Sequence, residues 1–303
     1  MPSLLAVAAA HDVVGVFTQA DRPAGRGLKL RATAVKAAAV GASLPVETPD
    51  KLDARFVGSV ARLRPETLVT VSYGKILPAA LLAVPTLGAL NLHPSLLPAY
   101  RGATPIQSAL RDGLTETGVS VIWMTPKMDA GDIALERRVA IEPADDFGTL
   151  HDRLAGFAAE LIALALARLS RGALGRVPQD EAVATFTRPL TRQDGRLSFE
   201  DAGSSANLVR SLSPAPGAWT ELAGKRIKVL RARAEPAVAT RPQEVGTTLS
   251  GGAAAPGVIA SLEGDGPVIA CRTGALRLLR VVPEGKPPMS GADFVRYLKS
   301  LSA

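Results

Sequence analysis

Cysteine is nearly absent from this 303-residue chain. Its single cysteine, Cys271, excludes an internal disulfide framework and fits a reducing compartment. The strand-like run around Cys271 predicts that its side chain is buried. The sequence contains no run of about 18 uncharged apolar residues, so no transmembrane helix is expected. The apolar segment from Leu4 to Ala10 lacks the basic flank and the cleavage site of a signal peptide. These absences favour a cytoplasmic protein.

The overall composition is that of a globular protein with a basic C-terminal third. The chain is 47% hydrophobic, carries a net charge of +7 and is long enough for two domains. Residues 191–303 hold 15 Lys/Arg against 10 Asp/Glu, whereas residues 1–190 hold 20 against 18. A basic module beside a second domain suggests a polyanionic partner such as nucleic acid, although a solvated basic surface would look the same.

The first 172 residues alternate between strand and helix patterns. Strands are predicted at 13–18, 67–72, 88–92 and 119–123, and helices at 32–40, 104–111 and 149–169. Such alternation predicts an α/β domain with a Rossmann-like, doubly wound and mostly parallel sheet. In such sheets, ligands bind at the carboxyl ends of the strands.

The pattern changes after residue 172. Residues 173–191 have turn residues and little periodicity, which predicts a linker. Residues 192–303 contain short strand-like runs at 227–230, 257–259, 268–271 and 275–282, followed by a helix at 290–301. We therefore expect an all-β module, such as a small barrel, with a loop at 234–256.

The most informative cluster combines Asn91 and His93 with Asp129. An amide, an imidazole and a carboxylate can together stabilise an oxyanion and move a proton. Two residues apart on a strand, Asn91 and His93 share one face, and prolines restrict the backbone that follows. Asp129 by itself would be interpreted as a turn residue. The cluster predicts acyl or one-carbon group transfer. No metal site is expected, because neither a histidine nor a third carboxylate lies near Asp129 and Asp132 in the sequence.

A second candidate is the segment from Thr18 to Arg31. Its glycines and prolines predict a long exposed loop that carries four basic residues, including Arg26 and Lys29. Its glycines do not match a phosphate-binding loop. The loop is either a solvated connector or a basic finger that contacts phosphates.

These motifs resemble enzymes that use 10-formyltetrahydrofolate, and specifically the methionyl-tRNA formyltransferase family. The resemblance covers the chain from about Asp12 to near its C-terminus. It implies that Asn91, His93 and Asp129 are catalytic. It also implies folate contacts from Ser95, Leu96, Leu97, Pro98, Tyr73 and Ile76.

Two features indicate a tRNA acceptor. The run from Asp21 to Gly27 resembles the loop with which members of the family reach the acceptor stem of the tRNA. Arg26 matches the arginine of that loop that enters the end of the acceptor-stem helix. The basic module resembles the family's OB-like C-terminal domain. The resemblance implies tRNA contacts from Arg26, Lys29, Lys225, Arg226 and Lys228.

The implied reaction transfers a formyl group from 10-formyltetrahydrofolate to the methionine amine of initiator methionyl-tRNA and releases tetrahydrofolate. The resemblance also implies a monomer that has no membrane partner. Asp129 is expected to raise the pKa of His93. Alternatives are transfer to a small amine, such as glycinamide ribonucleotide or an amino sugar, hydrolysis of 10-formyltetrahydrofolate, or RNA binding by an inactive relative.

The N-terminus departs from the family, which begins with a strand, a loop and a helix before the strand matching residues 13–18. Only Leu4 to Ala10 resembles the end of that helix. The first strand would be central in the sheet. We therefore expect either a start site placed too late or a chain that folds poorly as written. Soluble yield and melting of this chain beside an N-terminally extended one would decide.

Overall fold

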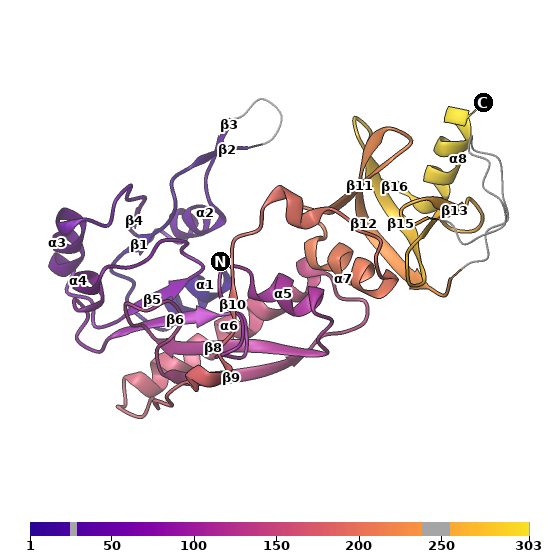
Figure 1. Cartoon of the computed structure of the whole chain (residues 1–303). Coiled ribbons are helices and arrows are strands. Elements are labelled where there is room, and N and C mark those ends of the chain that lie inside the picture. The colour runs from indigo at the N-terminus through magenta and orange to yellow at the C-terminus, as the bar shows by residue number, and fades with distance from the viewer. Residues whose placement is uncertain (25–28, 238–254, 303) are drawn as a thin grey trace. The chain divides into compact units, whose positions relative to one another are not determined.

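The computed structural model describes residues 1–24, 29–237 and 255–302 (Figure 1). These residues form two compact units. The first comprises residues 1–105, 116–140 and 151–188, and the second comprises residues 106–115, 141–150 and 189–303. The domain boundaries predicted at residues 172 and 191 stay predictions.

The first unit is an α/β assembly, which confirms the predicted fold class. Its helices are α1 (Pro2–Ala8), α2 (Ala34–Gly41), α3 (Ala54–Arg62), α4 (Ala79–Leu82) and most of α6 (Phe147–Leu169), whereas α5 (Pro105–Arg111) belongs to the second unit from its second residue onward. Its strands are β1 (Val16–Phe17), β2 (Arg22–Ala24), β3 (Lys29–Arg31), β4 (Val46–Glu47), β5 (Leu68–Val71), β6 (Ala89–His93), β7 (Arg101–Gly102), β8 (Glu116–Trp123), β9 (Ile133–Ala140) and β10 (Phe186–Thr187).

A four-stranded sheet in the order β5-β6-β8-β9 carries the site. The β5–β6 pair is parallel, as expected, but β8 is antiparallel to both β6 and β9. The sheet is therefore mixed, and the expectation of a mostly parallel sheet does not hold for it. The strand predicted at 119–123 is confirmed as part of β8, whose residues 117–123 are buried without interruption.

The strand predicted at 13–18 is much shorter than expected. Only Val16 and Phe17 are paired, in parallel with β4, and Val14 is 37% exposed. The strand predicted at 67–72 forms β5 but is only partly buried. Among the described residues, β1 and β5 belong to separate sheets. A two-stranded ladder such as β1–β4 is marginally stable by itself, which agrees with its short length.

The helices predicted within the first 172 residues form within two residues of their expected ends. Thr33 caps α2, since its hydroxyl oxygen accepts the backbone N–H of Lys36. Pro105 is the first residue of α5, where its missing N–H is tolerated. The long helix α6 covers the predicted range, and its apolar side chains Leu150, Leu154 and Ile162 are fully buried.

The second unit contains a six-stranded antiparallel sheet. Its strands are β11 (Ala218–Leu222), β12 (Lys225–Glu235), β13 (Ile259–Ser261), β14 (Val268–Ala270), β15 (Ala275–Pro283) and β16 (Met289–Ser290), and its helices are α7 (Ala202–Leu212) and α8 (Gly291–Ser302). The strands predicted at 227–230, 268–271 and 275–282 and the terminal helix are present, but the strand predicted at 257–259 shares only Ile259 with β13, and β11, β16 and α7 were not predicted. Cys271 is buried in this core, as expected. Most of the loop predicted at 234–256 lies outside the described residues.

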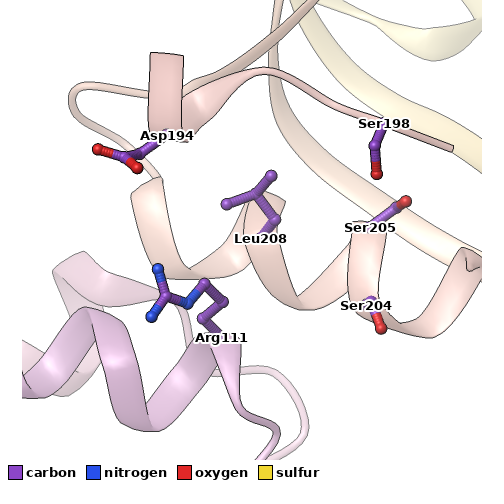
Figure 2. Close-up of a pocket in the computed structure, with 6 residues that line it drawn as sticks. All are labelled: Arg111, Asp194, Ser198, Ser204, Ser205 and Leu208. Atoms are coloured by element: carbon purple, nitrogen blue, oxygen red, sulfur yellow. The ribbon is translucent and has the colours of Figure 1, made fainter. Parts of the chain in front are cut away.

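A polar cavity of about 220 Å³ opens within the second unit. It is lined by Arg111, Asp194, Ser198, Ser204, Ser205 and Leu208 (Figure 2). None of these residues belongs to the predicted site.

The segment from Thr18 to Arg31 is not the irregular loop that its composition predicts. Its described part contains β2 and β3, which pair antiparallel, with Lys29 as the first residue of β3. The predicted tRNA contact Arg26 lies outside the described residues. Within the described ranges, no helix has the length and apolar character to cross a membrane.

Candidate active site

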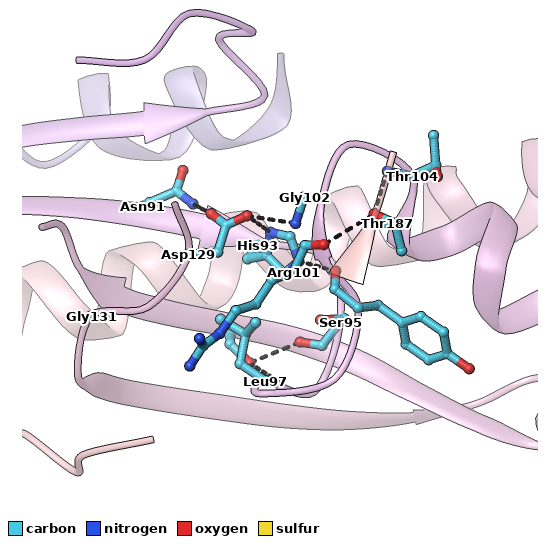
Figure 3. A network of polar contacts seen from close by, with 12 residues as sticks. Asn91, His93, Ser95, Leu97, Arg101, Gly102, Thr104, Asp129, Gly131 and Thr187 are labelled. Carbon is cyan, nitrogen blue, oxygen red and sulfur yellow. Dashed lines mark hydrogen bonds and ion pairs between the residues drawn. The ribbon is translucent and has the colours of Figure 1, made fainter. Parts of the chain in front are cut away.

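The structure brings Asn91, His93 and Asp129 together on one face of the sheet (Figure 3). Asn91 and His93 lie on β6, two residues apart, with His93 as its last residue. Asn91 Nδ2 lies 3.4 Å from Asp129 Oδ1, and His93 Nδ1 lies 3.5 Å from Asp129 Oδ2. The carboxylate therefore bridges the amide and the imidazole.

Asp129 lies in the connection between β8 and β9. Its φ of 50° is in the left-handed region, which aspartate tolerates better than most residues. Two residues later the chain passes so close to β8 that a Cβ at Gly131 would stand 1.6 Å from the Trp123 carbonyl oxygen. Only glycine fits there, and this close approach brings Asp129 back towards Asn91.

The Asp129 carboxylate also accepts a hydrogen bond from the backbone. Gly102 N donates to Asp129 Oδ2 at 2.8 Å. Gly102 has a φ of 109°, and a Cβ there would lie 2.3 Å from the Thr187 carbonyl oxygen, so this position also requires glycine. The N–H is thus aimed at the carboxylate by a backbone conformation that other residues strongly disfavour.

Both ring nitrogens of His93 are engaged within the protein. Nε2 lies 2.9 Å from the Tyr100 carbonyl oxygen, which can only accept, so Nε2 carries a proton. Nδ1 faces Asp129. Donation from His93 to an oxyanion therefore requires that one of these two contacts be exchanged.

The expectation that the pKa of His93 is raised is wrong in its net direction. The His93 side chain is 5% exposed, and this burial lowers its pKa below the ordinary value of 6.5. The Asp129 charge does act in the expected sense, since it raises the pKa, as does the contact with Tyr100, but desolvation is the larger effect. His93 is therefore neutral at pH 7 in the free protein.

This balance can be measured, because the chain has only three histidines. We expect the imidazole ¹³C and ¹H NMR signals of His93 to titrate below pH 6.5. In Asp129→Asn they should titrate at still lower pH, because the substitution removes the charge that favours imidazolium. The signal is assigned by its absence in His93→Ala. A midpoint at or above 6.5, or one that Asp129→Asn raises, would contradict the arrangement.

The predicted folate segment after His93 divides into buried and accessible parts. The Ser95 side chain is fully buried, and its hydroxyl donates to the Ala99 carbonyl oxygen at 2.6 Å. Leu97 is also buried, and its N–H donates to the Ser120 hydroxyl oxygen at 3.2 Å. Leu96 and Pro98 are only partly buried. Ser95 and Leu97 thus shape the turn, while Leu96 and Pro98 have surface left for a ligand.

The other predicted folate residues follow β5, whose carboxyl end lies at the same edge of the sheet as that of β6. Ile76 is 79% exposed. Tyr73 is partly buried, and its hydroxyl has no hydrogen-bond partner among the described residues. Burial raises the pKa of Tyr73, so its hydroxyl stays protonated. A buried hydroxyl without a partner is a group that a polar ligand would satisfy.

Three residues of the site had no signal in the sequence. Arg101 is 1% exposed, and its guanidinium binds Gln179 and Glu181 from the segment predicted as a linker. The Arg101 hydrogen bonds hold the pKa of the Glu181 carboxyl below its ordinary value. Gln179 also contacts the backbone of the Asp129 connection. Gln179 and Glu181 follow Arg101 by 78 and 80 positions, and Gln179 follows Asp129 by 50. Only the tertiary contacts reveal that these residues belong to the site.

The predicted tRNA contacts of the second unit lie on two faces of β12. Arg226 and Lys228 alternate with core residues and share the face of Trp219, with Lys228 directly opposite Trp219 in the ladder. The Arg226 guanidinium lies 4.3 Å from the centroid of the Trp219 ring, and that of Arg196 lies 5.5 Å from it. Lys225 points to the other face, where Nζ lies 2.9 Å from the Tyr297 hydroxyl.

Among the described residues, no group of three or more histidine, cysteine or acidic side chains is placed to bind a metal ion. The Asp129 carboxylate lies 3.4 Å from the Asn91 amide and 3.5 Å from the His93 imidazole, and proton transfer with His93 requires the second distance to shorten to roughly 3 Å when substrate binds.

Family profiles match most of the chain. The profile described as "Formyl transferase" matches residues 5–166, and that described as "Formyl transferase, C-terminal domain" matches residues 189–299. Among solved structures, an N-formyltransferase from Helicobacter canadensis, crystallised with folinic acid and dTDP-3-aminofucose, has a TM-score of 0.63 over 91% of this chain and 93% of its own. At 12% identity, this likeness shows the fold alone.

Curated relatives are much more similar in sequence. A methionyl-tRNA formyltransferase from Moorella thermoacetica is 40% identical over 299 residues, which are 98% of this chain and 92% of that protein. One from Methylobacterium nodulans is 42% identical over 296 residues, which are 96% of this chain and 90% of that protein. With both profiles matched and this identity over nearly the whole length, the chain belongs to the methionyl-tRNA formyltransferase family.

Proposed function

We propose that this protein transfers the formyl group of 10-formyltetrahydrofolate to the α-amino group of methionine on initiator methionyl-tRNA, for translation initiation. The observation that carries the proposal is the convergence of Asn91, His93 and Asp129 in a chain about 40% identical to tRNA formyltransferases. The enzyme acts in the cytoplasm as a monomer.

In the proposed reaction, the methionine nitrogen attacks the formyl carbon and the bond from that carbon to N10 of the folate breaks. Asn91 Nδ2 donates to the oxyanion that develops on the formyl oxygen. Its present contact with Asp129, at 3.4 Å, is long and is easily exchanged for a stronger one. The amide is therefore available at the moment when charge appears.

One proton must move from the attacking amine to the leaving nitrogen. The Asp129 carboxylate and the unprotonated His93 Nδ1 face one another at 3.5 Å, so the pair can hold this proton between them. The carbonyl of Tyr100 keeps Nε2 protonated and fixes the ring for this role. A water molecule then carries the proton to N10.

Folate is proposed to bind at the carboxyl edge of β5 and β6. The unpaired Tyr73 hydroxyl and the exposed Ile76 lie in the connection after β5, and Leu96 and Pro98 follow β6. Together they offer a polar anchor and an apolar surface, which a pteridine or benzoyl ring requires. The Helicobacter enzyme, in complex with folinic acid, shares the fold.

For tRNA binding, we propose the Trp219 face of the second unit together with Arg26. The stacked guanidinium of Arg226 is held against the Trp219 ring, and the Lys228 side chain runs over Gly217, where a Cβ would meet it at 2.6 Å. Two cations fixed on one surface suit contacts to phosphates. The role of Arg26 rests on sequence resemblance.

We expect Arg226→Ala and Lys228→Ala each to weaken tRNA binding and to reduce the slope of log affinity against log salt by about 0.7–0.9. Lys225→Ala removes the same charge from the other face of the strand and should change the slope less. Filter binding at several salt concentrations measures this. A flat salt response of the unsubstituted protein, or a larger effect of Lys225→Ala, would contradict the assignment.

One assay tests the function directly. The protein is given 10-formyltetrahydrofolate with charged initiator tRNA, with glycinamide ribonucleotide, with an amino sugar nucleotide, or with water alone. Formylated methionyl-tRNA is the expected product. Faster formylation of a small amine, or release of formate without an acceptor, would overturn the proposal in favour of those activities.

A further inference from the structure

Gln179 uses every hydrogen-bonding group of its amide within the site. Nε2 donates to the Asp129 carbonyl oxygen at 2.8 Å and to the Gly131 carbonyl oxygen at 2.7 Å. Oε1 accepts from Arg101 Nε at 3.0 Å and from the terminal nitrogen Nη2 at 2.8 Å. A primary amide has two donor hydrogens and one oxygen with two lone pairs, so this group is fully satisfied.

Arg101 links Gln179 to the same carboxylate by a second route. Glu181 binds the Arg101 guanidinium with both carboxylate oxygens, at 3.0 and 2.8 Å. The residue after Arg101 is Gly102, whose N–H donates to Asp129 Oδ2. The backbone of Asp129 is thus held by Gln179. Its carboxylate is held by the N–H of Gly102, the residue that follows Arg101 (Figure 3).

The Asp129 connection needs such support. It runs from the end of β8 at Trp123 to the start of β9 at Ile133 without regular secondary structure, and it includes the left-handed backbone of Asp129 itself. Without partners, its carbonyl groups would accept water, and the carboxylate would sample several orientations.

We propose that Gln179 is a positioning residue: its amide fixes the Asp129 connection so that the carboxylate meets Asn91 and His93. The inference rests on the proposed function, because Asp129 is taken to act in formyl transfer. The segment 173–188 then completes the active site instead of only connecting domains.

The sharpest variant is Gln179→Glu. It keeps the size of the side chain and both acceptor contacts with Arg101, but it replaces the two N–H donors with an oxygen that faces the Asp129 and Gly131 carbonyls. We expect kcat to fall roughly 10–100-fold, as for a displacement of about 1 Å in a reacting group, with KM for folate and tRNA within about twofold of the unsubstituted protein. Gln193→Glu, at an exposed glutamine of the second unit, is the matched control and should keep its kcat.

A double-mutant cycle separates positioning from general structural damage. In Asp129→Ala the group that Gln179 positions is gone, so adding Gln179→Glu should cost little further kcat. Equal fold losses with and without the Asp129 carboxylate would overturn the inference, as would a kcat of Gln179→Glu within twofold of the unsubstituted protein.

Gln179→Met, of similar length and without a buried carboxylate, repeats the test if Gln179→Glu does not fold. If neither variant shows a cooperative thermal transition, Gln179 is a folding residue and the inference is wrong. The outcomes also distinguish this inference from the proposed function. Lack of tRNA formylation by the unsubstituted protein refutes the function, whereas normal turnover of both Gln179 variants refutes only the positioning role.

Discussion

Asn91→Ala is expected to reduce kcat by roughly 100–1,000-fold, the usual cost of one oxyanion donor. The structure supports this size of effect, because the Asn91 amide projects from β6 beside the Asp129 carboxylate and its 3.4 Å contact with that carboxylate is weak. Folate affinity should change little, since the donor acts on charge that is absent from the ground state. Single-turnover formylation and equilibrium folate binding measure the two quantities.

The chain offers a matched control, because its only other asparagine is Asn207, on α7 of the second unit. Asn207→Ala should leave kcat within about twofold of the unsubstituted protein. A loss of folate affinity in Asn91→Ala, with turnover restored at saturation, would show that Asn91 binds the donor and does not stabilise the oxyanion.

His93→Ala is expected to lower kcat about as much as Asn91→Ala does.

The second large effect is expected for Asp129→Ala, which should lower kcat by roughly 100–10,000-fold. The carboxylate meets three groups at once, namely Asn91 Nδ2, His93 Nδ1 and Gly102 N. Its removal ends the proton exchange with His93 and also deprives the Gly102 N–H of its acceptor.

Asp129→Asn separates these two roles. The amide keeps an oxygen that can accept from Gly102 N, but it cannot take up a proton. If orientation were the main role of Asp129, Asn would restore much of the activity that Ala loses. We expect Asn to be nearly as slow as Ala, with a melting temperature closer to that of the unsubstituted protein. Substantial recovery of kcat in Asp129→Asn would refute the proton-transfer role.

Local sequence signals predicted the parts of the fold that depend on neighbouring residues. Pro105 marks a helix start, and the spacing of Asn91 and His93 on one strand places both side chains on one face. These features follow from backbone geometry, which repeats every 3.6 residues in a helix and every two in a strand. The strand predicted at 119–123 also forms, as part of β8, although residues 117–123 are all buried.

Strand direction and burial were decided only in three dimensions. Antiparallel pairing of β8 depends on which strand edge is free when the chain folds, and no local pattern records that. The direction of the His93 pKa shift likewise depends on how much water the whole unit excludes from its ring. The sequence showed the Asp129 charge but not the desolvation that outweighs it.

By itself, the sequence determined the family, the α/β and β modules, and the catalytic candidates, since each is encoded in short motifs or in periodicity. The tertiary structure decided which groups complete the site. Gln179 and Glu181 come from a segment without pattern, yet they meet Arg101 across about 80 residues of chain. Hydrogen bonds over such a separation depend on the packed fold and leave no trace in local spacing.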